Sequence, residues 1–252
     1  MSTIYLPSNI FANLIANSMP ESLRNSVSFI PSALISKQIE KEESIGLIPT
    51  MDLIKHNELF ISSSAGLSFD GILSNSYIYF KPGENEVDKV ILSGDVSSIE
   101  SLTAKILFSE LYNIDVDVHL SSFNGDRIVE NTILIGDDNF LSSFYLNGLS
   151  FAEEMIELIS APYVNFVFAS NSDSILKEFN LALKGISEKF YSLGEQGNFQ
   201  MQLSNDTKNF IIENLNSCVV ELEEQDIEGI NQLIRIPYYH GILDNIIEPK
   251  FV

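Results

Sequence analysis

Residues 27–49 read VSFIPSALISKQIEKEESIGLIP, and this stretch decides the fold class. Its two ends, 27–30 and 45–49, are short apolar runs typical of buried strands, and the segment between them has helical spacing. Pro31 stands at the first helical position, where its missing N–H costs nothing. A strand, a helix and a second strand form a βαβ unit, whose crossover makes the two strands parallel.

The same alternation extends in both directions along the chain. A strand at 3–6 and a helix at 9–18 precede the unit and complete a βαβαβ order. Residues 63–75 read as a loop with room for one short strand, because they are small and contain two glycines. The remaining predicted strands are 59–62, 76–81, 89–93, 116–120, 131–136 and 163–170, and the remaining predicted helices are 97–112, 138–146, 151–159, 172–194, 204–216 and 224–235.

The connection KPGENEVD at 81–88 separates two α/β units, so we expect two lobes. The first lobe is predicted to contain 1–82 and 171–252, and the second 83–170. The chain then passes between lobes at 76–81 and again at 163–170, which leaves a cleft. Ligands of open parallel sheets lie beyond the carboxyl ends of the strands, where helix N-termini point their free amides.

Composition excludes several classes of partner. Lys and Arg number 14 against 35 Asp and Glu, and the net charge of −21 repels both nucleic acid and anionic membrane surfaces. The chain lacks a basic leader and any run of 18 apolar residues, so we expect a soluble protein that stays where it is made.

A single cysteine, Cys218, cannot form an internal disulfide and is expected to be a small buried hydrophobe, which fits a reducing, cytoplasmic location. The three histidines are far apart, and we expect neither a metal nor a cofactor. The sequence does not determine the oligomeric state.

Serines crowd the start of one predicted helix, in SGDVSSIESLTAKILFSELY at 93–112. Ser97 and Glu100 have the spacing of a capping box, in which the hydroxyl accepts from a helical N–H and the carboxylate reaches back. Ser98 and Ser101 are not needed for this cap. Their hydroxyls and the helix-start amides could bind a carboxylate, or they could serve only solubility and capping.

Three other segments carry polar residues at similar places. Asp137, in ILIGDDNF, suits a helix N-terminus but could also accept a hydrogen bond from a ligand hydroxyl. Ser8 and Asn9, after the first strand, are ready N-caps and candidate ligand contacts. Asn75, in FDGILSNS, precedes a crossing strand and is either a loop residue or a ligand contact.

Nucleotide-binding glycine motifs and the hydrolase G-x-S-x-G motif are absent. Six segments, in the correct order, instead resemble the enzymes of the futalosine route to menaquinone that include chorismate dehydratase and dihydroxynaphthoate synthase. These segments are SIGLIPTMDLI (44–54), SSAGLSFDGILSNS (63–76), DVSSIESLTAKIL (95–107), ILIGDDNF (133–140), YVNFVFAS (163–170) and CVVELEEQDIEGINQL (218–233).

The resemblance implies an α/β, two-lobed, periplasmic-binding-protein-like (type II) fold with a ligand cleft between the lobes. It places a small-molecule carboxylate ligand against Ser97, Ser98 and Ser101 on one side and Asn75 on the other. The chain departs from the family pattern at Asn75, at Glu100 and across 155–163, where the family has a tryptophan motif and this chain has no tryptophan.

Two functions follow from these observations. The first is a lyase that resembles chorismate dehydratase and acts on a small cyclic carboxylate. The second is a diverged protein of the same fold that binds a small molecule or a partner without turnover. The altered motifs and the negative charge favour the second, and the extent of the resemblance favours the first.

Overall fold

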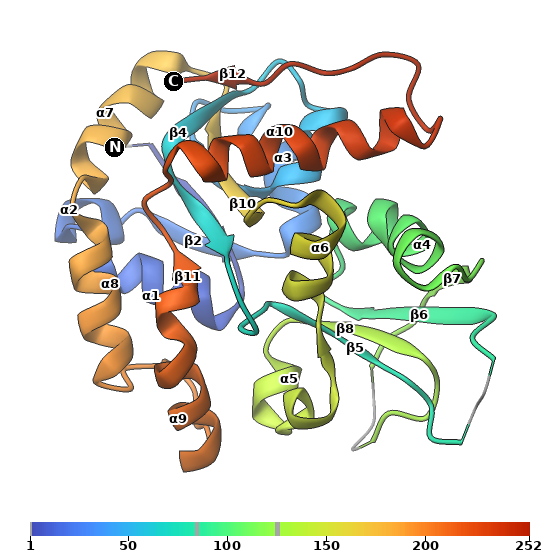
Figure 1. The fold of residues 1–252 in the computed structure, drawn as a ribbon. Coiled ribbons are helices and arrows are strands. Elements are labelled where there is room, and N and C mark those ends of the chain that lie inside the picture. Colours follow the sequence, from blue (N-terminus) through green and yellow to red (C-terminus); the bar gives the residue numbers. More distant parts are fainter. Residues whose placement is uncertain (1, 84–85, 124–126) are drawn as a thin grey trace.

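Two β-sheets, each covered by its own helices, organise the chain (Figure 1). The computed structural model describes residues 2–83, 86–123 and 127–252, so part of the acidic connection at 81–88 lies outside the described residues. We call the seven-stranded sheet with its helices the first lobe and the five-stranded sheet with its helices the second lobe. Figure 1 shows the first lobe at the upper left and the second at the lower right.

The first lobe contains the βαβαβ unit that the sequence predicts. Its strand order is β11-β4-β10-β3-β1-β2, with β12 paired to β4. The central strand β1 pairs in parallel with β2 and β3, whereas β10 runs antiparallel to both β3 and β4. These strands are β1 (Ile4–Pro7), β2 (Val27–Ile30), β3 (Ile45–Pro49), β4 (Phe60–Phe69), β10 (Tyr163–Ser170), β11 (Cys218–Val219) and β12 (Lys250–Phe251).

The second lobe has the strand order β7-β6-β8-β5-β9. Strand β6 is parallel to β7 and β8, and β5 is antiparallel to β8 and β9. These strands are β5 (Ser76–Tyr79), β6 (Lys89–Gly94), β7 (Asp117–Leu120), β8 (Thr132–Ile135) and β9 (Leu149–Ser150).

Helices connect the strands and cover both faces of the first sheet. The α-helices are α1 (Ile10–Ser18), α2 (Glu21–Arg24), α3 (Ser32–Ile39), α4 (Ser98–Tyr112), α5 (Asp138–Leu141), α6 (Phe151–Ile159), α7 (Asp173–Leu183), α8 (Ile186–Glu195), α9 (Asn205–Asn214) and α10 (Glu224–Tyr239). Short 3₁₀ turns are η1 (Thr50–Ile54), η2 (Phe144–Asn147) and η3 (Leu215–Ser217).

The hydrophobic core has two parts. One cluster packs α3 and α10 against one face of the first sheet, through residues such as Ile35, Val167 and Ile230. The other cluster covers the opposite face under α1, α7 and α8 and continues without a break into the second lobe. Cys218 is fully buried in this second cluster, which confirms its predicted role as a small hydrophobe.

Sheet membership corrects the predicted lobe boundaries. The boundary at 82/83 assigns β5 to the first lobe, but β5 pairs with β8 in the second sheet. The boundary at 170/171 assigns β10 to the second lobe, but β10 pairs with β3 and β4 in the first sheet. The reason is that an apolar run predicts a strand but carries no information about which strand it pairs with.

Three predicted elements differ in extent. The predicted loop at 63–75 largely belongs to β4, because the small residues of that stretch pair with β10 on one side. The predicted helix 172–194 is two helices, α7 and α8, because Gly185 takes φ 81° and turns the chain. The predicted helix 138–146 is α5 followed by η2, separated at Ser143, which has a left-handed φ of 54°.

Candidate functional site

The predicted ligand-binding residues meet at the junction of the two lobes. Asn9 begins α1 in the first lobe, and Asn75 lies on the segment that passes from β4 to β5. Ser97 and Asp137 follow strands β6 and β8 in the second lobe. Hydrogen bonds made by these residues or by their neighbours in the chain link the four positions, and we call this series the interlobe network.

The start of α1 is held by side chains from both lobes. Asn9 is the N-cap, and its Oδ1 accepts from the Ala12 N–H at 2.9 Å. Asp137, from the β8–α5 turn of the second lobe, accepts from the Ile10 N–H through Oδ1 at 2.8 Å. A carboxylate near the amides of a helix N-terminus is favoured by the helix dipole, so Asp137 fixes the second lobe against α1.

A matching contact holds the start of α3, and sequence reasoning missed it. Asp95, directly after β6, accepts from the Ser32 N–H with both carboxylate oxygens, at 3.1 and 3.2 Å, and also from the Ser32 hydroxyl. Ser32 is the first residue of α3, in the first lobe. The N-termini of two helices of the first lobe, α1 and α3, are therefore each bound by a carboxylate of the second lobe.

A repeated motif explains the two contacts. Residues 91–95 read ILSGD and 133–137 read ILIGD, at the ends of the adjacent parallel strands β6 and β8. In both copies the glycine has a positive φ, 93° at Gly94 and 97° at Gly136, a conformation that other residues rarely adopt. The turn that follows aims each aspartate at the other lobe, and the repeated Ile-Leu-x-Gly-Asp was the available signal for Asp95.

Both carboxyl groups have raised pKa values. Burial raises the pKa of Asp137 to about 6, and repulsion from Asp138 and Asp95 adds to this effect although the Ile10 N–H opposes it. Burial also raises the pKa of Asp95, against the hydrogen bonds from Ser32. Burial thus disfavours the charged forms of both carboxyl groups by more than their amide and hydroxyl donors favour them.

The predicted capping box at α4 is present. Ser97 accepts from the Ile99 N–H at 3.1 Å, and Glu100 Oε2 accepts from the Ser97 N–H at 3.0 Å and its hydroxyl at 2.7 Å. Glu100 is 1% exposed and also accepts from the Ser76 hydroxyl at 3.0 Å, and its burial raises its pKa. Since Glu100 lies inside the second lobe, its bonds join the start of α4 to β5.

The other two serines of that stretch have different surroundings. The Ser101 hydroxyl donates to the Ser97 carbonyl at 2.8 Å, so it is engaged locally, and its residue is exposed. Ser98 is half-buried, and its Oγ is buried with no hydrogen-bond partner among the described residues. Ser8, beside Asn9, is exposed at the edge of the junction.

Asn75 connects the two halves of the network. Its carbonyl accepts from the Gly136 N–H at 2.8 Å, next to Asp137, and the neighbouring Ser76 reaches Glu100. Asn75 is 3% exposed, and its side-chain Oδ1 has no partner among the described residues. The network therefore links α1 to α4 by hydrogen bonds at the ends of β8 and β5, connected through neighbouring residues of the chain.

Some of the unmatched polar atoms belong to predicted site residues. Seven buried side-chain N or O atoms of the described residues lack a hydrogen-bond partner, and three of them belong to predicted site residues: Asn9 Nδ2, Asn75 Oδ1 and Ser98 Oγ. Leaving a buried polar group unpaired costs about 1–3 kcal/mol, so such atoms call for an explanation. A bound molecule with hydrogen-bonding groups would supply the missing partners.

Aromatic rings close the junction beside the polar network. Phe11 of α1 contacts Phe69 of β4 and Phe140 of α5, with ring centroids 5.2 and 5.9 Å apart. Tyr145 of η2 stacks on Phe210 of α9 at 4.3 Å. Because Phe11–Phe140 and Tyr145–Phe210 each join a residue of the first lobe to one of the second, aromatic packing adds to the two aspartate contacts in holding the lobes together.

The described residues contain no group of three or more His, Cys, Asp or Glu side chains arranged to hold a metal ion. Over the same residues, no helix combines the length and the apolar character needed to cross a membrane.

Comparison with solved structures identifies the fold. Protein AF1704 from Archaeoglobus fulgidus aligns with a TM-score of 0.59 and 13% identity, over 96% of this chain and 98% of that one. The aliphatic sulphonate binding protein SsuA of Escherichia coli aligns with a TM-score of 0.54 and 10% identity, over 98% and 94%. The chain has the type II periplasmic-binding-protein-like fold.

The ligand-binding component of an ABC-type import system from Staphylococcus aureus, solved with zinc bound, is similar to the same degree. Its TM-score is 0.57 at 12% identity, over 98% of this chain and 96% of that chain. No protein-family description matches the chain, and no curated protein matches it in sequence. At these identities the likeness establishes the two-lobed architecture, which confirms the predicted fold class.

Proposed function

We propose that this chain binds a small molecule at the interlobe network and releases it unchanged. The observation that carries the proposal is the trio of buried, unmatched atoms on Asn9, Asn75 and Ser98. They combine an amide donor, an amide acceptor and a hydroxyl. One protein of similar fold is named an aliphatic sulphonate binding protein and another the ligand-binding component of an import system, and the proposal extends small-molecule binding to this chain.

The charges at the network favour a ligand without negative charge. Asp95 and Asp137 already occupy the amides of α3 and α1, where an anion would otherwise bind. A further carboxylate about 4 Å from one of them would cost about 4 kcal/mol at an effective dielectric of 20. We therefore propose an uncharged or cationic ligand that carries hydroxyl or amine groups, in place of the carboxylate that the resemblance implied.

A thermal-shift screen tests this proposal. Polyols, amino alcohols and carboxylates of matched size are compared at equal ionic strength. The proposal expects stabilisation by members of the first two classes only, and expects the Asn75→Ala variant to lose that stabilisation. Asn209→Ala, at an exposed position on α9, is the matched control. Stabilisation that persists in Asn75→Ala, or that carboxylates produce as well, would reject the proposal.

The lyase remains a second candidate because of Asp137. A carboxyl group with a pKa of about 6 can exchange a proton near neutral pH, which general acid–base catalysis requires. This candidate carries with it a role in menaquinone biosynthesis, a cyclic carboxylate substrate and a cytoplasmic location, all of which remain proposals.

Incubation with chorismate separates the two candidates. If the chain is a lyase, the cyclohexadiene absorbance falls and the enolpyruvyl benzoate forms. Neither change is then expected with the Asp137→Asn variant. The binding proposal predicts no product from the wild-type chain.

A further inference from the structure

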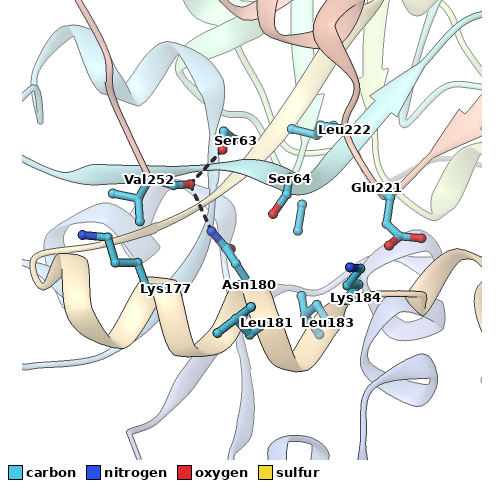
Figure 2. Close-up of a pocket in the computed structure, with 11 residues that line it drawn as sticks. Ser63, Ser64, Lys177, Asn180, Leu181, Leu183, Lys184, Glu221, Leu222 and Val252 are labelled. Atoms are coloured by element: carbon cyan, nitrogen blue, oxygen red, sulfur yellow. Dashed lines mark hydrogen bonds between the residues drawn. The ribbon is translucent and has the colours of Figure 1, made fainter.

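We infer a second ligand site, separate from the interlobe network, that takes a small amphipathic monocarboxylate. It is a cavity of about 620 Å³ between α7 and the first half of β4, shown in Figure 2. A volume in this range, with apolar surface and several polar groups in its lining, is typical of pockets that hold small organic molecules.

The floor of the cavity is apolar and belongs to the core. Ala65 of β4, Leu183 of α7 and Leu222 are buried, with exposures of 2%, 2% and 8%. Leu181 also lines the cavity and is 76% exposed. An apolar ligand body would cover Leu181 and remove this surface from water.

Hydrogen bonds hold both ends of the cavity in place. At one end the main-chain oxygen of Val252 accepts from the Ser63 hydroxyl at 2.9 Å and from the Asn180 side-chain amide at 3.1 Å, as the dashed lines in Figure 2 mark. At the other end Glu221 accepts from the Gly185 and Ser187 N–H groups at 2.7 and 3.2 Å. The walls are therefore formed before any ligand binds, which reduces the entropic cost of binding.

Two lysines stand at opposite ends of the α7 side of the cavity. Lys177, Leu181 and Lys184 are four and three residues apart, so they share one face of the helix, and Figure 2 shows Leu181 between the two lysines. The ionisable side chains that line the cavity are Lys177, Lys184 and Glu221, so cations exceed anions there, whereas the whole chain has 14 basic residues against 35 acidic ones. The two lysines supply the charge complementarity for an anionic headgroup.

The two lysines differ in how far they are already paired. Lys177 contacts Asp173 at 2.9 Å in the same helix. Lys184 forms no ion pair with any residue that the structure describes. Glu221, whose charge interacts with Lys184, accepts from the Gly185 and Ser187 N–H groups. Burial opposes ionisation of Glu221, but these bonds and the Lys184 charge together lower its pKa. Lys184 is therefore the ammonium group available to a ligand carboxylate.

Calorimetric titration with decanoate, at concentrations below micelle formation, tests the inference. The wild-type chain is expected to bind decanoate. Lys184→Ala is expected to weaken binding by about tenfold, which corresponds to about 1.4 kcal/mol. Ser64→Trp is expected to abolish binding, because Ser64 is an exposed residue of the cavity wall and a large ring there fills the space.

Two controls locate the site. Lys37→Ala removes the same charge from α3, on the opposite face of the sheet, and Asn75→Ala alters the interlobe network. Both are expected to bind decanoate as the wild type does. The inference is overturned if the wild type fails to bind decanoate, if Ser64→Trp binds it normally, or if Lys184→Ala and Lys37→Ala have equal affinities.

Discussion

Asp137 should make the protein less stable as the pH rises, and replacing it with asparagine should remove that dependence. The folded chain raises the pKa of Asp137 from 3.8 to about 6. Between these values the folded state binds more protons than the unfolded state, so the free energy of unfolding falls as the pH increases. The loss of stability caused by ionised Asp137 is absent below about pH 4 and complete above about pH 7.

The size of the effect follows from the shift. About two pKa units at 1.36 kcal/mol each give up to about 3 kcal/mol. Asparagine is neutral and keeps an oxygen that can accept the Ile10 N–H, so Asp137→Asn retains the cap and loses the charge. The variant should match the wild type near pH 4 and exceed its stability by up to about 3 kcal/mol near pH 8.

Urea unfolding followed by circular dichroism across this pH range measures the difference. Asp138→Asn, the neighbouring change, removes the same charge without touching the bond to α1. The reasoning is refuted if the difference between Asp137→Asn and the wild type is independent of pH. It is also refuted if the variant is the less stable of the two near pH 8, since the ionised form would then be the one that the fold prefers.

Three further substitutions probe the junction by unfolding measurements. Ser97→Ala removes the α4 cap and one of the donors to buried Glu100. It should lower the free energy of unfolding by about 2 kcal/mol. A decrease under about 0.5 kcal/mol would show that the capping box contributes little. Phe140→Ala should lower the free energy of unfolding by about 3–5 kcal/mol, because it empties a fully buried site between the lobes. A smaller decrease would mean that the lobes pack independently. Gly94→Ala should lower the free energy of unfolding by more than about 2 kcal/mol, because φ is 93° and a Cβ would lie 1.9 Å from the main-chain oxygen of Ile135. An unchanged free energy of unfolding would contradict the geometry of the turn before Asp95.

Sequence reasoning located most strands and helices because their apolar periodicity is strong. The strands at 27–30, 45–49 and 163–170 and the helix at 151–159 have the predicted bounds. Periodicity is less informative where one residue redirects the chain, as Gly185 does between α7 and α8. It also carries no information on pairing, which is why the predicted lobe boundaries do not follow the sheets that β5 and β10 join.

The candidate site was predictable in position but not in chemistry. Helix starts after parallel strands were expected to lie near one another, and hydrogen bonds do link the positions of Asn9, Asn75, Ser97 and Asp137, whereas their role in binding a ligand stays a prediction. Which polar atoms are already used depends on contacts between distant segments, such as Ser76 with Glu100. Asp95 was not identified because its partner, Ser32, is 63 residues away.

Nuclear magnetic resonance mapping of a ligand found in the thermal-shift screen tests the central claim most directly. Amide shifts of the ¹⁵N-labelled chain are followed as an uncharged or cationic compound is added. The account predicts that the largest shifts fall on Asn9, Asn75, Ser98 and the segments next to them. Shifts confined to other parts of the chain, or a strongest response to a carboxylate at these same residues, would contradict it.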